Sequence, residues 1–532
     1  MRLDPITAEV IRNALSYSAE EMGIALRNSA YSHNIKERMD HSCALLSPQG
    51  RLLAQAEHIP VHLGSLPWGV KNVLRYCRRK GEVWKQDDIV MVNDPYVVGT
   101  HLSDVTLVKP IVLDGTPVGF SVNKAHHADV GGDTPGSLSS DATSLYQEGV
   151  VIAPTKLVSQ GRLDEEALED FTRQVRNPDI TLGDLRAQIA AVNLGERRVV
   201  ELAQRYGAGM LSAAYGEIVR HSEREMRRRL EVIPAGSYTA EDCLEDIGNG
   251  ADLTWIRVKL TREEKRLVVD FAGTDRQVRA PFNAVFGVTL SAAYFAVKSI
   301  VDPEAPMNEG VLRPVKVLAP RGSLVNPRRP APVSGGNLET SQRIADVVFR
   351  ALAHAVPQRV PAASHGSMNN VIVGGFDPAR ERQWVFVETN GGGSGGCPGK
   401  DGVSGIHCNM TNTMNTPIEA IEQYYPMLFQ EYELRPDTCG DGRWKGGCGI
   451  RRSWTLLGPA ATVTILGDRN AVGPWGLDGG KAGGLASYRV RRKDGSEEKL
   501  GSKVTFDIAE GDTVIIDTPG GGGYGMAGET GS

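Results

Sequence analysis

A strand followed by a β-hairpin constrains the fold of this chain more than any other feature. The apolar run 89–92 ends at a turn, and two further strand-like runs, 106–113 and 118–122, flank Asp114-Gly115. Asp-Gly between two such runs is a strong signal for a tight hairpin turn. We therefore expect strands here, with the residues at their ends on neighbouring backbone segments.

Three polar residues flank this hairpin. His101 and Asp104 precede it after a Gly99-Thr100 turn, and His126 follows its second strand. Two imidazoles and a carboxylate can bind one divalent cation and leave positions open for water or substrate. From spacing alone, a structural hydrogen-bond network among the same side chains remains an alternative. Loops at strand ends are common places for catalytic groups, which favours the metal interpretation.

Other polar residues nearby are weaker candidates. Asp40 precedes a predicted strand and could be a fourth metal ligand or a cap for the following turn. Adjacent side chains in an extended chain point to opposite faces, so His127 cannot easily share a metal with His126. His127 and Asp129 suit hydrogen bonding to the ligands or proton transfer instead. Three further histidines lie close in sequence: His41, His58 and His62.

Composition excludes several classes of protein. The 532 residues are enough for a large core, and 59 basic against 64 acidic side chains give a net charge of −5. This balance provides no electrostatic footprint for nucleic acid. The longest apolar run, 284–297, is shorter than the roughly 20 residues that a membrane span needs. The start, Met1 to Pro5, does not resemble a signal peptide, so we expect a cytoplasmic protein.

The cysteine pattern argues against a disulfide framework. There are seven cysteines, widely spaced and without a Cys-x-x-Cys motif. An odd number at such spacing also disfavours a cysteine zinc site. We expect reduced thiols.

Hydrophobic periodicity predicts an α+β or mixed α/β protein with a strand-rich C-terminal half. Asp4 and Pro5 are suited to the start of a helix over 4–28. The remaining expected elements are a hairpin at 42–53, helices over 164–229, strands over 236–271, helices at 288–300 and 342–355, and short strands with glycine-rich turns after 371.

Two glycine-rich stretches, 391–396 and 520–525, formally satisfy G-x-G-x-x-G. That fingerprint must open a helix inside a strand–helix–strand unit. Cys397-Pro398 follows the first stretch and opposes a helix, and the second lies close to the chain end. We therefore expect no dinucleotide site, and glycine at tight turns that need positive φ. No phosphate-binding G-x-x-x-x-G-K-[ST] occurs.

The chain resembles the B subunit of the hydantoinase B/oxoprolinase family. The matching stretches run from one end of the chain to the other: Asp4-Pro-Ile-Thr-Ala-Glu-Val-Ile, Lys36-Glu-Arg-Met-Asp-His-Ser-Cys-Ala, His62-Leu-Gly-Ser, Asn93-Asp-Pro-Tyr, Gly99-Thr-His-Leu-Ser-Asp, His126-His-Ala-Asp-Val-Gly-Gly, Gly183-Asp-Leu-Arg-Ala-Gln, Gly336-Asn-Leu-Glu-Thr-Ser-Gln-Arg, Gly467-Asp-Arg and Thr518-Pro-Gly-Gly-Gly-Gly-Tyr-Gly. The resemblance implies a large multi-layer fold over residues 1–527. Within it we distinguish, provisionally, a metal-binding α/β part (1–160), a helical part (161–235), a β-rich part (236–330) and a glycine-rich mixed part (331–527).

The resemblance also implies a site and a partner. Family metal ligands would fall on Asp40, His101, Asp104 and His126, holding Mn, Zn, Fe or Co. A partner A subunit with an actin-like ATPase fold would use ATP to phosphorylate the substrate's carbonyl oxygen, and the two would form a hetero-oligomer. A glycine-rich wall would offer backbone N–H groups to a phosphate or oxyanion.

The implied activity is ATP-dependent opening of a cyclic amide or imide ring, such as a hydantoin, 5-oxoproline or a lactam. One alternative is a subunit of an ATP-dependent ketone carboxylase of the acetone or acetophenone type. A third possibility is a non-catalytic scaffold, which would have no need of the His/Asp set.

Overall fold

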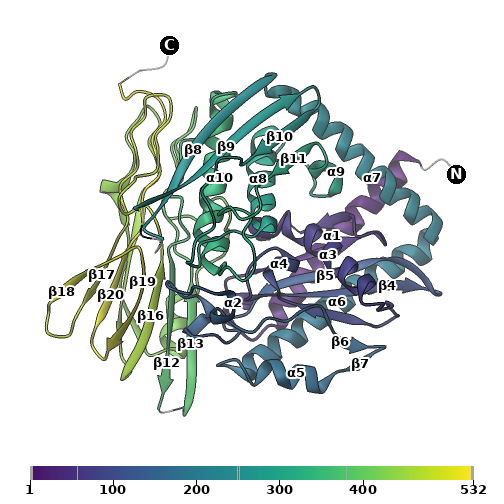
Figure 1. Ribbon diagram of the computed structural model, residues 1–532, viewed down its shortest axis with the longest axis horizontal. Helices are drawn as coiled ribbons and strands as arrows, with labels where there is room; N and C mark the ends of the chain where they lie inside the picture. The colour runs from purple at the N-terminus through teal and green to yellow at the C-terminus, as the bar shows by residue number, and fades with distance from the viewer. Residues whose placement is uncertain (1–3, 57, 248–249, 251, 379, 529–532) are drawn as a thin grey trace.

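The computed structural model describes residues 4–56, 58–247, 250, 252–378 and 380–528. The first three residues, on which the expectation about a signal peptide partly rests, lie outside these ranges. Figure 1 shows the N-terminal sheet, coloured purple to blue, on one side of the molecule and the C-terminal sheets, green to yellow, on the other. Helices α8 (Phe286–Val301) and α10 (Ser341–Ala353) lie between them in this view. The expected mixed α/β class is confirmed.

The N-terminal sheet has the strand order β2-β1-β5-β4-β3-β6-β7. Its strands are β1 (His41–Leu46), β2 (Leu52–Gln55), β3 (Ile89–Val92), β4 (Asp104–Leu113), β5 (Thr116–His126), β6 (Thr155–Ser159) and β7 (Arg162–Leu163). The predicted hairpins are confirmed, but β4 and β5 are longer than expected. Their register pairs Asp104 directly with His126.

Helices cover both faces of this sheet. On one face lie α1 (Pro5–Ser29), which Asp4 caps by accepting from the Thr7 N–H, and α6 (Pro178–Tyr206). On the other face, Leu66 and Val70 of α3 (Ser65–Arg79) pack against apolar side chains of β4 and β5. Further helices are α2 (His33–Lys36), α4 (Pro95–Val98), α5 (Glu165–Thr172), α7 (Ala208–Arg229) and α9 (Glu309–Leu312). Because both faces are covered, the strand ends at Asp104 and His126 are buried.

Three more sheets follow. The second, β11-β10-β9-β8, consists of β8 (Gly236–Glu245), β9 (Leu253–Glu263), β10 (Arg266–Asp270) and β11 (Val315–Leu318), with α8 and α10 packed close to it. The third is β13-β12-β16-β19, with β12 (Asn370–Asp377), β13 (Arg382–Glu388), β16 (Ala460–Leu466) and β19 (Lys503–Ala509). The fourth is β14-β15-β20-β17-β18, with β14 (Met427–Arg435), β15 (Gly449–Leu456), β17 (Ser487–Arg491), β18 (Glu497–Leu500) and β20 (Thr513–Asp517), preceded by α11 (Ile418–Tyr424).

Two buried clusters join these layers. One packs the third sheet on the fourth, with Val463 and Ile465 against Trp454 and Val514. The other is continuous from the N-terminal sheet through α8 and α10 to Ile372 of β12. The beginnings of β4 and β12 therefore belong to one core. Of the helices in the described ranges, none combines the length and the apolar character that a membrane span requires.

The glycine-rich stretches serve a purpose other than the expected one. Within 391–396 and 520–523 no glycine has positive φ, so the expectation of positive-φ turns is wrong there. Gly525, at the end of the second stretch, does have positive φ, at +73°. Instead, these extended segments pack backbone on backbone: a Cβ on Gly393 would lie 1.9 Å from the Gly447 oxygen, and one on Gly521 2.0 Å from the Ser394 oxygen. Among the described residues, no helix begins directly after either stretch.

The N–H groups of these glycines are used within the stack. Gly393 donates to Pro519, Gly521 to Gly447, and Gly523 to Lys481, in each case to a backbone oxygen. The glycine-rich segments therefore do not present a wall of free donors to an oxyanion, which corrects that expectation.

One disulfide corrects the expectation of reduced thiols. Cys439 and Cys448 are bridged, and the bridge closes a short loop beside the glycine stack. The other five cysteines are free. A single local bridge is still far from a disulfide framework.

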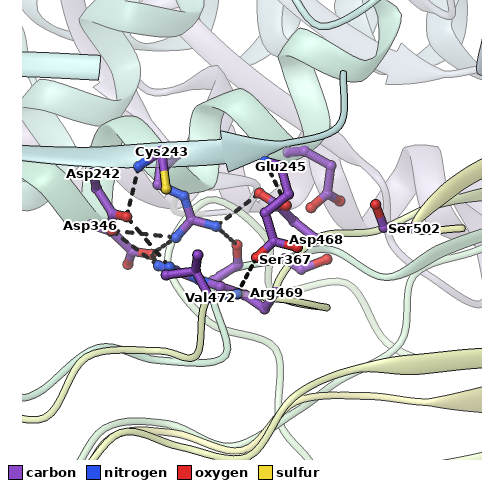
Figure 2. Close-up of polar contacts among 12 residues, drawn as sticks. Asp242, Cys243, Glu245, Asp346, Ser367, Asp468, Arg469, Val472 and Ser502 are labelled. Carbon is purple, nitrogen blue, oxygen red and sulfur yellow. Dashed lines mark hydrogen bonds and ion pairs between the residues drawn. The ribbon is translucent and has the colours of Figure 1, made fainter. Parts of the chain in front are cut away.

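A buried ion network connects the second sheet to the third (Figure 2). Arg343 of α10 pairs with Asp346 (2.9 Å) and with Asp468 (3.0 Å), which follows β16. Arg469 pairs with Asp346 and with Asp242 of β8, both at 3.1 Å. All five side chains are almost completely buried. Two of the stretches that carried the family resemblance, 336–343 and 467–469, therefore meet in this network.

Beside the network, Glu339 gives the fold a pH dependence. Burial, reinforced by the nearby Asp468 carboxylate, raises the pKa of Glu339 from 4.5 to about 7. A carboxyl whose pKa is raised on folding contributes stability that is complete below its unfolded pKa and is lost as pH rises through its folded pKa.

We therefore expect Glu339→Gln, which cannot ionise, to lose less stability than the wild type between pH 5 and pH 8. The difference amounts to about 1.4 kcal/mol for each unit by which the pKa is raised. Urea denaturation at pH 5, 6.5 and 8 measures it, with Glu419→Gln on the exposed α11 as a control. Parallel pH profiles for wild type and Glu339→Gln would contradict this assignment.

Candidate metal centre

The site forms where β4 begins and β5 ends. Asp104 is the first residue of β4 and pairs with His126, the last residue of β5. His101 reaches the same point from the loop after α4. That loop turns at Gly99, whose φ is +80° and whose Cβ would lie 2.9 Å from the Gly287 Cα. Close packing against α8 thus requires glycine at this turn and fixes where His101 emerges.

Three side-chain atoms converge. His101 Nε2 lies 3.1 Å and His126 Nδ1 3.3 Å from Asp104 Oδ1, and the two nitrogens are 3.0 Å apart. Adjacent ligands at about 2.1 Å from one metal ion are roughly 3 Å apart, so these spacings suit a shared cation. The chemistry of the donor set, two imidazoles and one carboxylate, fits Mn, Fe, Zn or Co. The residues therefore fit a divalent metal, and the predicted grouping of these three is found.

Asp104 is the negative centre of the site. Burial alone would raise its pKa, but the His101 and His62 imidazoles hold it well below its usual range. The carboxylate is therefore ionised at neutral pH, even though its side chain is only 1% exposed. A buried anion of this kind is costly unless a positive charge lies beside it.

His62 is the neighbour that sequence reasoning ranked too low. It ends the 3₁₀ turn η1 (Pro60–His62), with Nε2 3.3 Å from Asp104 Oδ2 and Nδ1 2.9 Å from Ser42 Oγ. Burial lowers its pKa, so the ring is neutral and can donate to Asp104 from Nε2 while accepting from Ser42. His62 thus orients the carboxylate. Its only sequence signal was its place in the matching stretch 62–65.

Asp40 lies on the wall of the same cavity but outside the group of three. Its backbone oxygen accepts the His126 N–H at 3.0 Å, and its carboxylate lies 3.8 Å from the Arg38 guanidinium. Its role as a fourth ligand stays a prediction.

His127 and Asp129 are directed elsewhere. His127 Nε2 bonds the Gln188 side chain of α6 at 2.9 Å, on the opposite side of the strand from His126, as alternation requires. Asp129 accepts from the Gly131, Gly136 and Arg176 N–H groups and pairs with the Arg176 guanidinium. Neither residue lines the cavity beside the three ligands. Proton transfer by His127 or Asp129 therefore stays a prediction, which this geometry does not favour.

A buried lysine supports the loop that carries His101. Lys124 of β5 donates to the Val98 oxygen at 3.1 Å and to Thr100 Oγ1 at 2.9 Å. Burial lowers its pKa to about 8. No feature of the sequence singled out this residue.

The cavity beside the metal candidates has a volume of about 20 Å³. That is room for one water molecule or one cation. Its walls come from distant parts of the chain: Asp40, Asn337, Asn370, Thr389 and Met410 are among them. The site is therefore closed in this state, at the junction between the N-terminal sheet, η5 (Gly336–Thr340) and the third sheet.

Comparison with known proteins agrees with this architecture. The sequence model for hydantoinase B/oxoprolinase matches residues 4–527. The chain belongs to this family. It is 34% identical to the putative B subunit of a D-/L-hydantoinase from a Pseudomonas species, covering 98% of this chain and 90% of the relative. It is 36% identical to a 5-oxoprolinase of Dictyostelium discoideum, of whose length it spans 40%. An uncharacterized protein of Methanocaldococcus jannaschii is 50% identical over 98% of this chain and 91% of its own.

Two solved structures share the fold. The ATP-dependent caprolactamase of Pseudomonas jessenii has a TM-score of 0.91 at 30% identity, covering 99% of this chain and 92% of its own. An acetone carboxylase has a TM-score of 0.90 at 18% identity, and the match covers 98% of this chain and 76% of the carboxylase chain. The second likeness shows the fold alone. The name of the Pseudomonas hydantoinase relative, which designates one of several subunits, implies that some members of the hydantoinase B/oxoprolinase family work with a partner.

Proposed function

We propose that this chain is the metal-bearing subunit of an ATP-dependent amidohydrolase that opens a cyclic amide or imide ring. The convergence of His101, Asp104 and His126 beside a closed cavity carries the proposal. The substrate class follows from relatives named for hydantoin, 5-oxoproline and caprolactam. A hydantoinase A-type partner would use the ATP, because the sequence of this chain has no nucleotide-binding motif of a standard kind.

The chain's own residues prepare the site for hydrolysis. His101, Asp104 and His126 would hold the cation, which when bound supplies Lewis acidity and lowers the pKa of a water molecule. His62 fixes the Asp104 carboxylate, and Lys124 fixes the loop before His101.

A ketone carboxylase remains the second candidate, because the acetone carboxylase shares the fold. The greater identity to the caprolactamase favours the hydrolase. In the carboxylase, bicarbonate carbon would enter the product, whereas hydrolysis adds only water.

The decisive experiment combines the chain with an A-type ATPase, ATP, a divalent metal and ¹³C-bicarbonate. Hydantoin, 5-oxoproline and caprolactam are offered in turn, and then the ketones acetone and acetophenone. We expect ring opening coupled to ADP formation, with no ¹³C in the product, and neither reaction when the chain is omitted. Label in a new carboxylate would establish the carboxylase instead. Metal-free protein with full partner-dependent activity would establish a scaffold.

A further inference from the structure

Two asparagines on the cavity wall have polar atoms without a partner. Asn337 Oδ1 and Asn370 Nδ2 are buried and make no hydrogen bond within the described part of the chain, although the side chains are only 4% and 1% exposed. Both residues line the same cavity as His101, Asp104 and His126. A buried polar group left unpaired costs free energy, so each such group requires an explanation.

Two other buried asparagines show how the fold can satisfy such a side chain. Asn283 accepts from the Val278 N–H and donates to the oxygens of Val278, Ala280 and Pro332. Asn369, directly before Asn370, accepts from the Tyr488 hydroxyl at 2.8 Å. At the cavity, by contrast, one lining residue has a free acceptor and another has a free donor.

The backbone holds Asn337 firmly in this place. The preceding Gly336 packs so closely on 283–284 that a Cβ would lie 1.9 Å from the Asn283 oxygen. The Asn337 N–H donates to the Val333 oxygen, and its own oxygen accepts from Ser341 Oγ. Asn370 begins β12 and is paired with Leu466 of β16. Both amides are thus presented to the cavity from rigid elements.

From this juxtaposition we infer that Asn337 and Asn370 recognise the amide edge of the ring, Asn337 Oδ1 accepting its N–H and Asn370 Nδ2 donating to its carbonyl oxygen. A small ring locks its amide so that the N–H and the carbonyl oxygen lie on the same edge. One acceptor and one donor match that edge. The inference rests on the proposed function and names its specificity-determining residues. Because such a ring is larger than the cavity, its walls must separate when the ring enters.

A pair of small ligands tests the assignment without turnover. 2-Pyrrolidinone and γ-butyrolactone are five-membered rings with the same carbonyl, and the second has an oxygen where the first has its N–H. Ligand-observed NMR titration measures their binding to the purified metal-loaded chain, without ATP or partner. We expect the wild type to bind the lactam at least about ten-fold more tightly than the lactone, since a site built for an N–H rejects the analogue that lacks it.

The two asparagines then give different signatures. Asn337→Leu removes the acceptor, so the affinity for the lactam should fall about ten-fold or more. The ratio of lactam affinity to lactone affinity should then be close to one. Asn370→Leu removes the donor to the carbonyl oxygen, so the affinities for the lactam and for the lactone should both fall. The preference for the lactam over the lactone should persist. An unchanged preference in Asn337→Leu, or no preference in the wild type, overturns the inference.

Thermal unfolding separates this role from a structural one. Replacing an unpaired buried amide by an apolar side chain of similar size should leave Tm unchanged or raise it, whereas Asn283→Leu should lower it. A marked loss of Tm in both cavity variants would show that the amides serve the fold. If the asparagines are needed for ring binding but the complete system with partner and ATP opens no ring, the proposed function is contradicted and this inference stands. If the complete system opens a ring but Asn337→Leu leaves the ligand preference unchanged, this inference is contradicted and the proposed function stands.

Discussion

Asp104→Asn is expected to yield a folded protein without bound divalent metal and with ring opening slowed by about 10³-fold or more. The substitution removes the negative charge that His101, His126 and His62 all contact. Lewis-acid stabilisation of a transition state contributes several kcal/mol, and 1.36 kcal/mol corresponds to a factor of ten in rate. Elemental analysis of the purified variant and the partner-dependent rate of ring opening measure the two effects.

Two further variants make the result specific to the site. His62→Gln should reduce metal affinity only about 10- to 100-fold, because His62 orients the carboxylate without belonging to the converging trio. His221→Ala, at an exposed histidine on α7, should change neither metal content nor rate. Stoichiometric metal in Asp104→Asn would show that the cation lies elsewhere.

Arg343→Gln is expected to cause the largest loss of stability, about 3–5 kcal/mol of the free energy of unfolding. Arg343 is fully buried between Asp346 and Asp468, with Asp242 at 3.5 Å. Its removal leaves buried carboxylates without compensation, which is far more costly than losing a surface pair. Burial already raises the pKa of Asp346 to about 7, so the loss should be larger at pH 8, where that carboxyl is ionised, than at pH 5.

Urea denaturation at both pH values measures the effect, and Arg228→Gln is the matched control. Arg228 pairs with Glu225 on an exposed face of α7, with side chains 66% and 38% exposed. A pair of that kind contributes at most about 1 kcal/mol. If both variants lost the same stability, the network would have no special role in joining the second and third sheets.

Local signals in the sequence predicted the hairpin and, with it, most of the site. The Asp114-Gly115 turn joins β4 to β5, and an irregularity between Ile111 and Val112 shifts their register so that Asp104 lies opposite His126. His101 could be placed at the same site because only a short turn separates it from Asp104. A single sequence can therefore indicate that the two strand ends lie side by side, because the turn signal is local. The one-residue shift that makes Asp104 and His126 direct partners has no such signal.

The rest of the site depends on contacts between distant segments. His62 meets Asp104 from a short 3₁₀ turn, and Asn337 and Asn370 reach the cavity from two other layers. No spacing rule relates these positions, so periodicity could not find them. His127 and Asp129 were placed near the site by their sequence neighbourhood, but strand alternation and the Arg176 pairing direct them away.

The glycine stretches show how one pattern can have two physical causes. Glycine is needed where φ is positive and also where two backbones touch, and the sequence does not distinguish these. In this chain, the stretches at 391–396 and 520–523 serve the second purpose.

That packing leaves part of the molecule unusually intolerant of mutation. At Gly393, Gly520 and Gly521 even a methyl group would strike a backbone oxygen from 1.9 or 2.0 Å away. The smallest possible mutation, to alanine, must therefore push whole segments apart, and no neighbouring side chain can be trimmed to make room. An apolar core can accept a substitution when a neighbouring side chain changes size to compensate. The glycine-rich segments can accept one only if their main chains move apart.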